Sequence, residues 1–407
     1  MKFQKREGKT EKDRLRKTVV IPQYYRRFRC AGNTCPETCC RGWDISADQE
    51  TMKKYRALKK AGFDFGEGVD FLRGRIRMKE EGCPFLENGL CRIHRELGEK
   101  YLCHTCRSYP RHAEDYGSRR EWSLSLSCPE AAGLILTSPN GLQLQEYVLK
   151  TGEEEALLFC LLKIRALMFS FLSDRTRPLE YRLALILTLS HDLQPFVKRA
   201  FQDEDDRESF KHMEEILNRY ELFKTPAGYR WLLRKLSKWE KRPEERYDSM
   251  AGFLGLLREM PEIYPGFDFM VSEWMENLYR TEEGYGDYKK MISAAGFDSN
   301  GELKLESCLW YENLASSLLY VYTLGAVYDG QLHSKVKFVL FFMLCIREAY
   351  TASKTEGKEQ GEELFIELVS RFCRQIEHSD TVLDQIEQAI RGQRRFCMEA
   401  FLINLLN

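Results

Sequence analysis

The sequence predicts a mainly α-helical protein, in which a loop-rich, cysteine-rich metal-binding domain at the amino terminus precedes a large all-α helical bundle or array. Three observations predict this fold class. All 12 prolines lie at or before Pro265, which leaves 142 residues without a helix breaker. Apolar residues recur at helical spacing through the middle and end of the chain. Nine of the 14 cysteines lie within the 99 residues from 30 to 128, where glycine and proline interrupt short segments.

The chain is expected to have three regions: a basic arm at residues 1–20, a cysteine-rich domain at 21–137 and a helical domain at 142–407. Residues 1–29 carry 11 lysines and arginines against three acids, although the whole chain has no net charge. We favour a solvated tail here over an arm that docks on an acidic protein or nucleic acid. The turn sequence from Ser138 to Gly141 marks the boundary before the helical domain.

Few helices are expected in the cysteine-rich domain and many in the helical domain. In the cysteine-rich domain they are Ala47–Lys60 and Arg92–Tyr101. In the helical domain, segments 156–172, 179–193, 314–327 and 336–346 are apolar nearly all round, which is typical of central helices. Amphipathic stripes lie within 210–220, 247–257, 365–376 and 383–390, and Asp380 is the expected N-cap of the last. No strand pattern is found after residue 142.

Composition also limits the compartment. The charged fraction is 30%, no apolar stretch is long enough for a membrane span, and the first 17 residues lack the apolar core of a secretory signal. We therefore expect a cytoplasmic protein without a membrane partner, and nucleic acid is not an expected partner either. Because thiols stay reduced in the cytoplasm, the dense cysteines indicate metal binding or redox chemistry rather than disulfides.

The clustered cysteines have the spacing of a metal site. Cys30 begins a C-x4-C-x3-C-C pattern, which is followed by Arg41, Gly42 and Trp43. The remaining members of the cluster are Cys83, Cys91, Cys103, Cys106 and Cys128. Thiolates on short glycine- and proline-rich loops can bind zinc or an iron–sulfur cluster, and ligand type alone does not separate the two. A radical S-adenosylmethionine enzyme is excluded, since its C-x3-C-x2-C motif would need a cysteine at Gly42.

The other cysteines and the nearby histidines have simpler interpretations. We expect core packing for the five cysteines outside the cluster, which are Cys160, Cys308, Cys345, Cys373 and Cys397. For His94, His104 and His112 we favour surface or supporting roles over metal ligation.

Four ordered blocks resemble a known family. They are Cys-x3-Cys-Cys-Arg-Gly-Trp, Gly-Cys-Pro-Phe-Leu with Gly-Leu-Cys-Arg-Ile, Thr-Cys-Arg-x-Tyr-Pro-Arg, and Ser-Leu-Ser-Cys-Pro-Glu-Ala-Ala. Between Tyr24 and Leu136 the chain is similar in this way to the flagellin lysine-N-methylase family. The cysteine pattern without the last block also resembles a wider group of small zinc- or iron-chelating domains. Cys103 departs from the family pattern, where a small polar residue is expected.

The resemblance implies a bacterial methyltransferase that carries an iron–sulfur cluster, of 4Fe-4S type, and transfers methyl groups from S-adenosylmethionine to surface lysines of flagellin. The implied metal ligands are Cys30, Cys35, Cys39, Cys40, Cys83, Cys91, Cys106 and Cys128, with Cys103 the weakest candidate. No glycine-rich β-turn-α segment locates a binding site for the methyl donor.

Aromatic and basic residues beside the cysteine blocks are the candidates for chemistry. Aromatic faces stabilise a sulfonium cation, and arginine binds carboxylates. The catalytic candidates are Trp43, Tyr109 and Arg111, and the candidates for binding the donor are Arg41, Arg107 and Trp122. Each aromatic could instead pack around the metal loops, and each arginine could instead bond sulfurs or nearby acids. The alternative function is a non-catalytic zinc- or iron-chelating or redox-sensing module on a helical interaction platform.

Overall fold

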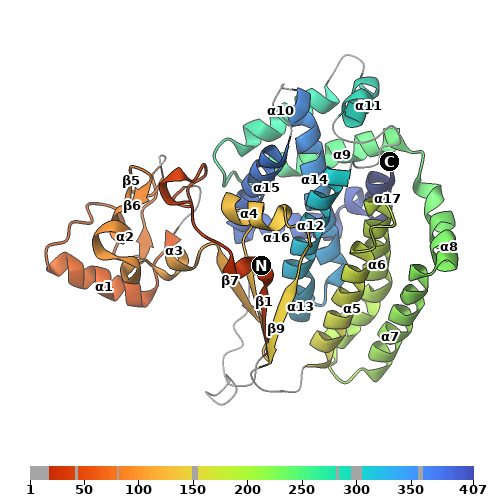
Figure 1. Cartoon of the computed structure of the whole chain (residues 1–407), viewed down its shortest axis with the longest axis horizontal. Helices are drawn as coiled ribbons and strands as arrows, with labels where there is room; N and C mark the ends of the chain where they lie inside the picture. Colours follow the sequence, from red (N-terminus) through yellow and green to blue (C-terminus); the bar gives the residue numbers. More distant parts are fainter. Residues whose placement is uncertain are drawn as a thin grey trace.

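The computed structural model describes residues 18–41, 45–79, 82–148, 155–280, 284–294, 305–355 and 361–407. A small lobe projects from a large helical body, and a four-stranded sheet lies where the two meet (Figure 1). The described part of the chain is predominantly helical, so the mainly α fold class is confirmed. None of the described helices is long and apolar enough to cross a bilayer.

The small lobe is built from short elements around one apolar core. Its elements are η3 (Gly32–Thr34), β2 (Ile45–Ser46), α1 (Gln49–Lys60), β3 (Val69–Asp70), β4 (Arg75–Ile76), β5 (Leu86–Glu87), β6 (Leu90–Cys91), α2 (Arg92–Leu97), η4 (Glu99–Tyr101) and α3 (His104–Ser108). Strands β2, β4 and β3 form one sheet, and β5 and β6 a hairpin. Asp48 caps α1 by accepting from the Thr51 amide at 2.9 Å, and it also accepts from the His104 amide at 2.8 Å. One carboxylate thus ties α1 to α3.

The two helices expected in this lobe are present, with shifted ends. Helix α1 begins at Gln49 because the Asp48 side chain caps it. Helix α2 ends at Leu97 because Gly98 has a φ of +85°, and a separate 3-10 turn, η4, follows.

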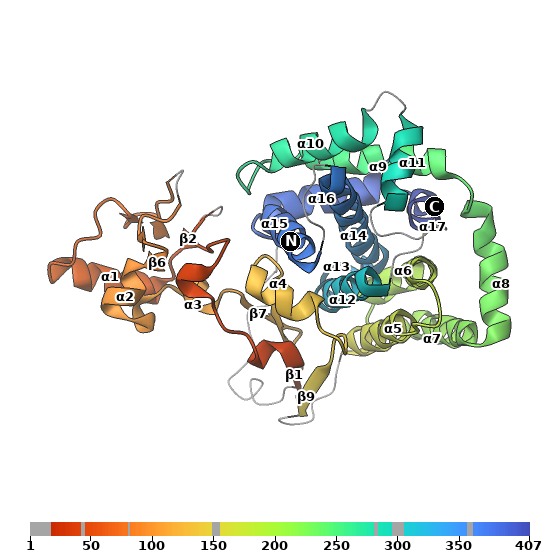
Figure 2. The same ribbon diagram turned by 45° about the horizontal axis from the view of Figure 1, so that its top comes forward.

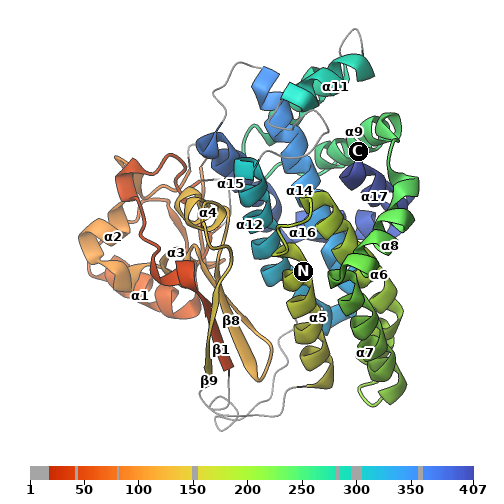
Figure 3. The same cartoon turned by 45° about the vertical axis from the view of Figure 1, so that its right-hand side comes forward.

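The sheet between lobe and body has the order β7-β8-β1-β9. Its strands are β1 (Thr18–Pro22), β7 (Arg111–Asp115), β8 (Arg119–Leu124) and β9 (Leu144–Val148). Strand β1 pairs in parallel with β8 and antiparallel with β9, and η2 (Gln23–Arg26) follows it. Figure 3 shows this sheet lying beside α5 (Ala156–Leu172) and α12 (Leu305–Tyr322).

Two expectations for these segments are wrong. Residues 18–20 of the predicted basic arm are not tail but part of an inner strand, and residues 1–17 lie outside the described residues. The predicted all-helical region contains strand β9. Most of its side chains are exposed and it is held through backbone pairing with β1, so it has no alternating apolar pattern.

The helical body surrounds α14 (Leu332–Thr355), which Figure 2 shows at its centre. The other helices are α4 (Pro129–Leu136), α6 (Leu179–Gln202), α7 (Arg207–Glu221), η5 (Leu222–Lys224), α8 (Pro226–Leu236), η6 (Ser237–Trp239), α9 (Pro243–Arg258), α10 (Phe267–Tyr279), α11 (Tyr285–Ala294), η7 (Thr323–Gly325), α13 (Ala326–Asp329), α15 (Glu362–Glu377), α16 (Asp380–Gly392), η8 (Arg394–Phe396) and α17 (Met398–Leu406). The four segments expected as central helices lie largely within α5, α6, α12 and α14. The N-cap of α16 is Ser379, which accepts from the Val382 amide, and not Asp380.

Apolar contacts divide the molecule into two cores. One contains buried residues between Ile45 and Cys103, and it belongs to the small lobe. The other joins the helices of the body to residues flanking that lobe, including Tyr24, Phe28, Leu124 and Leu126. Residues 18–28 and 109–136 therefore pack as part of the body.

The turn expected at Ser138–Gly141 is present. The Gly141 amide donates to the Ser138 carbonyl, and Gly141 has a φ of +69°.

Candidate functional site

The structure brings several of the clustered cysteines together in the small lobe. The Cys40 thiol hydrogen-bonds with the thiols of Cys39 and Cys83, and the Cys40 carbonyl accepts from the Cys83 amide at 2.7 Å. Cys103 and Cys106, at the start of α3, hydrogen-bond with each other. Although Cys103 is the weakest candidate from the sequence, its side chain is only 1% exposed and belongs to the same core as Cys83.

Hydrogen bonds between thiols change their acidity. The bonds from Cys39 and Cys83 lower the pKa of Cys40 to about 3, and the Cys106 bond lowers the pKa of Cys103 to about 7. The pKa values of Cys39, Cys83 and Cys106 rise well above the ordinary range, chiefly because each donates to a neighbouring sulfur. The small lobe thus contains two thiols with a lowered pKa, Cys40 and Cys103. Because the thiolate is the form that binds a metal, these two cysteines are well suited to be ligands.

The remaining members of the cluster are more loosely arranged. Cys30 is exposed, the Cys35 thiol donates to the Glu37 carbonyl at 3.2 Å, Cys91 is half-buried and Cys128 is buried. Within the described ranges, no three side chains of Cys, His, Asp or Glu surround one point in ligand geometry. The donor chemistry fits zinc or an iron–sulfur cluster, and the full ligand set stays a prediction.

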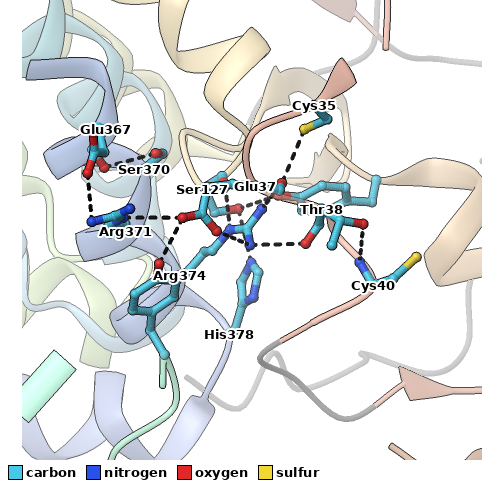
Figure 4. A network of polar contacts seen from close by, with 12 residues as sticks. Cys35, Glu37, Thr38, Cys40, Ser127, Glu367, Ser370, Arg371, Arg374 and His378 are labelled. Carbon is cyan, nitrogen blue, oxygen red and sulfur yellow. Dashed lines mark hydrogen bonds and ion pairs between the residues drawn. The ribbon is translucent and has the colours of Figure 1, made fainter. Parts of the chain in front are cut away.

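A single arginine of the helical body holds the cysteine loops in place. Arg374 on α15 is 3% exposed and donates to three backbone carbonyls, those of Glu37 at 2.6 Å, Thr38 at 3.1 Å and Ser127 at 2.9 Å (Figure 4). Two of these carbonyls lie in the loop from Cys35 to Cys40, and the third immediately precedes Cys128. The guanidinium of Arg374 thus joins the Cys35–Cys40 loop and the residue before Cys128 to α15, which itself carries Cys373. These three segments lie far apart in sequence.

Around this contact, Glu37 forms further bonds to the body. Its side chain accepts from the Tyr264 hydroxyl at 2.8 Å and pairs with Arg371 at 3.2 Å and with Arg374 at 3.4 Å. The Ser127 hydroxyl lies 3.0 Å from both the Tyr109 hydroxyl and the His378 Nε2 atom. The interface between the small lobe and the body therefore contains hydrogen bonds and ion pairs as well as apolar contacts.

A buried carboxylate lies next to this join. Glu377 accepts from the hydroxyls of Ser125 and Tyr322, each at 2.9 Å, and Ser125 in turn lies 2.6 Å from Ser127. Burial raises the pKa of Glu377 and lowers that of the adjacent His378 to about 4. Both groups are thus driven towards their neutral forms.

The chemically interesting residues named from the sequence do not meet in one pocket. Tyr109 joins the Ser127 contact. Arg111 lies over the rings of Tyr25 and Phe28, and Trp122 also contacts Tyr25, with ring centres 5.5 Å apart. Arg41 and Arg107 are exposed on the small lobe, and Trp43 lies outside the described residues. Of the other cysteines, Cys345 and Cys373 are buried and Cys160 is half-buried.

Core packing is wrong for Cys397, which is exposed because it occupies the turn between η8 and α17. The side chain of Cys308 lies outside the described residues.

A narrow cavity lies between the sheet and the end of α12. Its volume is about 50 Å³, and its walls are His112, Glu114, Tyr116, Glu121, Ser123, Tyr320, Val321, Tyr322 and Gly325. The strand register explains half of this lining: His112 pairs with Ser123 and Glu114 with Glu121, so alternate residues of β7 and β8 point to the same face. Sequence reasoning missed this site, except for His112, because its two halves are about two hundred residues apart.

Larger cavities also lie elsewhere on the body. A polar one of about 540 Å³ lies between the loop before β9, α5 and α12, and it includes Arg175, Glu312 and Ser316. An open apolar groove of about 870 Å³ lies among α6, α7, α8 and α17, with Phe223, Trp231 and Trp239 among its walls. The polar cavity and the apolar groove both have the size of small-molecule sites.

Comparison with known proteins assigns a family. Residues 165–404, more than half of the chain, match the model of the FliB lysine N-methylase C-terminal domain. The chain is 38% identical over 140 residues to the flagellar biosynthetic protein FliU of Salmonella muenchen, a match that covers 32% of this chain and 83% of FliU. It is also 38% identical over 140 residues to a lysine-N-methylase of Salmonella typhimurium and 37% identical to that of Salmonella choleraesuis.

Each of the two lysine-N-methylase matches covers 32% of this chain and 35% of the relative, so the matched region spans about a third of those proteins. No solved structure matches the chain. The family model covers most of the helical body, which includes Arg374 and Glu377. It also includes the residues of α12 that line the narrow cavity and the polar cavity. The chain therefore belongs to the FliB lysine N-methylase family.

Proposed function

We propose that the protein is a cytoplasmic protein-lysine N-methyltransferase that uses S-adenosylmethionine to methylate surface lysines of flagellin. The observation that carries this proposal is the match of residues 165–404 to the lysine N-methylase family model. The names of the relatives add a flagellar connection through FliU and lysine methylation through the two Salmonella methylases.

Lysine methylation makes two demands on the protein. The ammonium group must lose a proton so that its nitrogen lone pair can attack, and the reacting atoms must be aligned away from water. The donor supplies an electrophilic methyl group, whose bond electrons remain on sulfur. At the boundary between sheet and body, burial raises the pKa values of Glu377 and Tyr322. Such a desolvated environment favours the neutral amine of a lysine over its ammonium form.

We further propose that the small lobe carries an iron–sulfur cluster. Cys39, Cys40, Cys83, Cys103 and Cys106 are the residues whose contacts best support ligation, with Cys30, Cys35, Cys91 and Cys128 as the outer candidates. Because ligand sites of this kind stabilise the fold they belong to, the cluster would hold the short loops of the lobe together.

The methyltransferase activity is tested on flagellin itself. Flagellin from a strain with the gene should contain lysines heavier by methyl increments, and flagellin from a strain without the gene should lack these increments. Intact-mass and peptide mass spectrometry measure the difference. If both flagellins carry the same methyl-lysine content, the activity is refuted and a metal-binding or redox-sensing function is favoured instead.

The cluster is tested by metal analysis. Protein purified without oxygen should be brown and contain iron and acid-labile sulfide, and the Cys40→Ser, Cys83→Ser and Cys106→Ser variants should lose both. Cys160→Ser is the matched control, because Cys160 is a half-buried cysteine on α5 in the helical body. Colourless protein with stoichiometric zinc would replace the iron–sulfur assignment with a zinc site.

A further inference from the structure

The narrow cavity between the sheet and α12 has a volume close to that of one side chain. A cavity needs about 10 to 15 Å³ for each water-sized group, and this one measures about 50 Å³. It therefore holds roughly four such groups, which is close to the size of a lysine side chain and too small for a nucleoside. His112, whose side chain is 52% exposed, lies on the open side, whereas Tyr116, Ser123 and Glu121 are buried.

The walls of the cavity combine aromatic faces with carboxylates. Tyr116, Tyr320 and Tyr322 contribute three phenol rings. Burial raises the pKa of each phenol far above neutrality, so the rings stay uncharged. Aromatic faces and carboxylates together attract an organic cation, and the aromatic faces also accept the methylene groups that carry it.

The two acidic side chains that line this cavity, Glu114 and Glu121, have different partners. Glu121 is fully compensated, since it pairs with Arg119 and with Arg165 at 2.6 Å. Glu114 accepts from the Tyr328 hydroxyl at 2.9 Å and lies 3.5 Å from His112. Across the described ranges, neither Glu114 nor the buried Glu377 forms an ion pair with a lysine or arginine.

Glu377 lies directly behind the wall of the cavity. It accepts a hydrogen bond from the Tyr322 hydroxyl, and Tyr322 is itself a lining residue. Burial drives Glu377 towards its neutral form, whereas a cation brought next to it favours the ionised carboxylate and gains electrostatic energy from it. The cavity and its surroundings are thus complementary to an ammonium group on a narrow aliphatic chain.

We propose that this cavity, between His112 and Glu114 of β7 and Tyr320 and Tyr322 of α12, binds the side chain of the substrate lysine. The aliphatic chain enters past His112 and lies between the tyrosine rings, and the ammonium group pairs with Glu114. This assignment rests on the proposed lysine-methylating function, because it names the site at which that function would receive its substrate.

The binding step is testable without donor, cluster or flagellin. Saturation-transfer NMR on the full chain should detect Nα-acetyl-L-lysine methylamide, and should detect Nα-acetyl-L-norleucine methylamide much more weakly, since it lacks the ammonium group. Glu114→Gln should weaken binding of the lysine probe at least tenfold. Asp115→Asn, which removes a charge from the same strand where Asp115 pairs with Arg120, should change binding less than twofold.

A second variant guards against a folding defect. Ser123→Leu fills the cavity from the β8 wall and should abolish probe binding, while far-UV circular dichroism and thermal melting report whether either variant is folded. The proposal is overturned if the wild-type protein does not prefer the lysine probe, or if folded Glu114→Gln and Ser123→Leu bind it as the wild type does. A cavity that binds the probe in a protein that leaves flagellin unmodified would refute the proposed function alone.

Discussion

Arg374 shows how one buried side chain can organise ligands that lie far apart in sequence. Its guanidinium donates to the carbonyls of Glu37, Thr38 and Ser127, so α15 fixes both the Cys35–Cys40 loop and the approach to Cys128. Only arginine presents several donors in a rigid planar fork. The positive charge also favours thiolate at Cys40. The helical body is therefore needed for the cysteine loops to adopt their arrangement.

Replacing this arginine tests that conclusion. Arg374→Lys keeps the charge but loses the fork, and should lower the free energy of unfolding by about 2 kcal/mol, since carbonyl bonds of a buried charge are lost. Urea unfolding and iron content per chain measure the effect. Arg371→Lys is the control, because Arg371 is more exposed and such pairs contribute under about 1 kcal/mol. Equal losses in both variants would contradict a special role for Arg374.

A buried histidine makes the stability of the body depend on pH. His333 lies 2.9 Å from the Ser190 hydroxyl and beside His191, and burial together with the charge of Lys337 lowers its pKa to about 3. Below the ordinary histidine pKa of about 6.5 the unfolded chain binds a proton that the folded chain does not. This contribution to stability is therefore complete above pH 6.5 and is lost as the pH falls towards 3.

His333→Gln removes the titrating group and should flatten this dependence. Between pH 7 and pH 4.5 the variant should lose about 2 kcal/mol less of its free energy of unfolding than the wild type. Urea unfolding at the two pH values gives the comparison. Identical losses would show that His333 becomes protonated in the folded state as readily as in the unfolded one.

Helix α12 connects two of the cavities. Glu312, Ser316 and Tyr320 follow one another at four-residue spacing and so lie on one stripe of the helix. Glu312 and Ser316 line the polar cavity and Tyr320 lines the narrow one, with about 6 Å of helical rise between Ser316 and Tyr320. If the lysine enters the narrow cavity, the polar cavity on the same stripe is the better location for the methyl donor than the distant apolar groove.

Arginine variants distinguish the two donor sites. Arg175 forms a two-point contact with Glu312 in the polar cavity, and Arg219 pairs with Asp192 in the apolar groove. If the donor binds in the polar cavity, Arg175 is the cation that would pair with the carboxylate of its methionine part. Arg175→Ala should therefore weaken S-adenosylmethionine binding at least tenfold, and Arg219→Ala should not. Equilibrium dialysis measures both. The reverse order of effects would move the donor to the groove.

At the level of elements, the sequence predicts what local patterns determine. Helices such as α7 and α15 follow from the 3.6-residue period of their apolar residues, and the turn at Ser138–Gly141 from its composition. Strand β9 has no such pattern, because distant β1 holds it through backbone bonds. The narrow cavity likewise depends on residues far apart in sequence, because Glu114 of β7 and Tyr320 and Tyr322 of α12 line it together. No local sequence pattern marks Glu114 as part of a site.

At the scale of the whole molecule, the two cores differ greatly in size. The core of the small lobe consists of ten buried residues among those described, and two of them, Cys83 and Cys103, belong to the cysteine cluster. The core of the body extends over most helices and includes residues before and after the lobe, such as Phe28 and Leu126. The elements of the lobe lie between residues 32 and 108, and a domain of this size buries a comparatively small fraction of its surface, so its stability without an additional link is expected to be marginal.

Metal removal should therefore unfold one core and leave the other. In the full chain, a chelator under reducing conditions should greatly accelerate amide hydrogen exchange in α1 and α2, because bound metal would supply much of the folding energy of the lobe. Exchange in β8, α4 and α12 should change little, since these elements belong to the core of the body. Mass spectrometry of peptides from metal-loaded and metal-free protein measures both regions at once. Equal acceleration throughout would show that the protein unfolds as one unit, and unchanged exchange in α1 and α2 would show that the apolar core of the lobe is sufficient without metal.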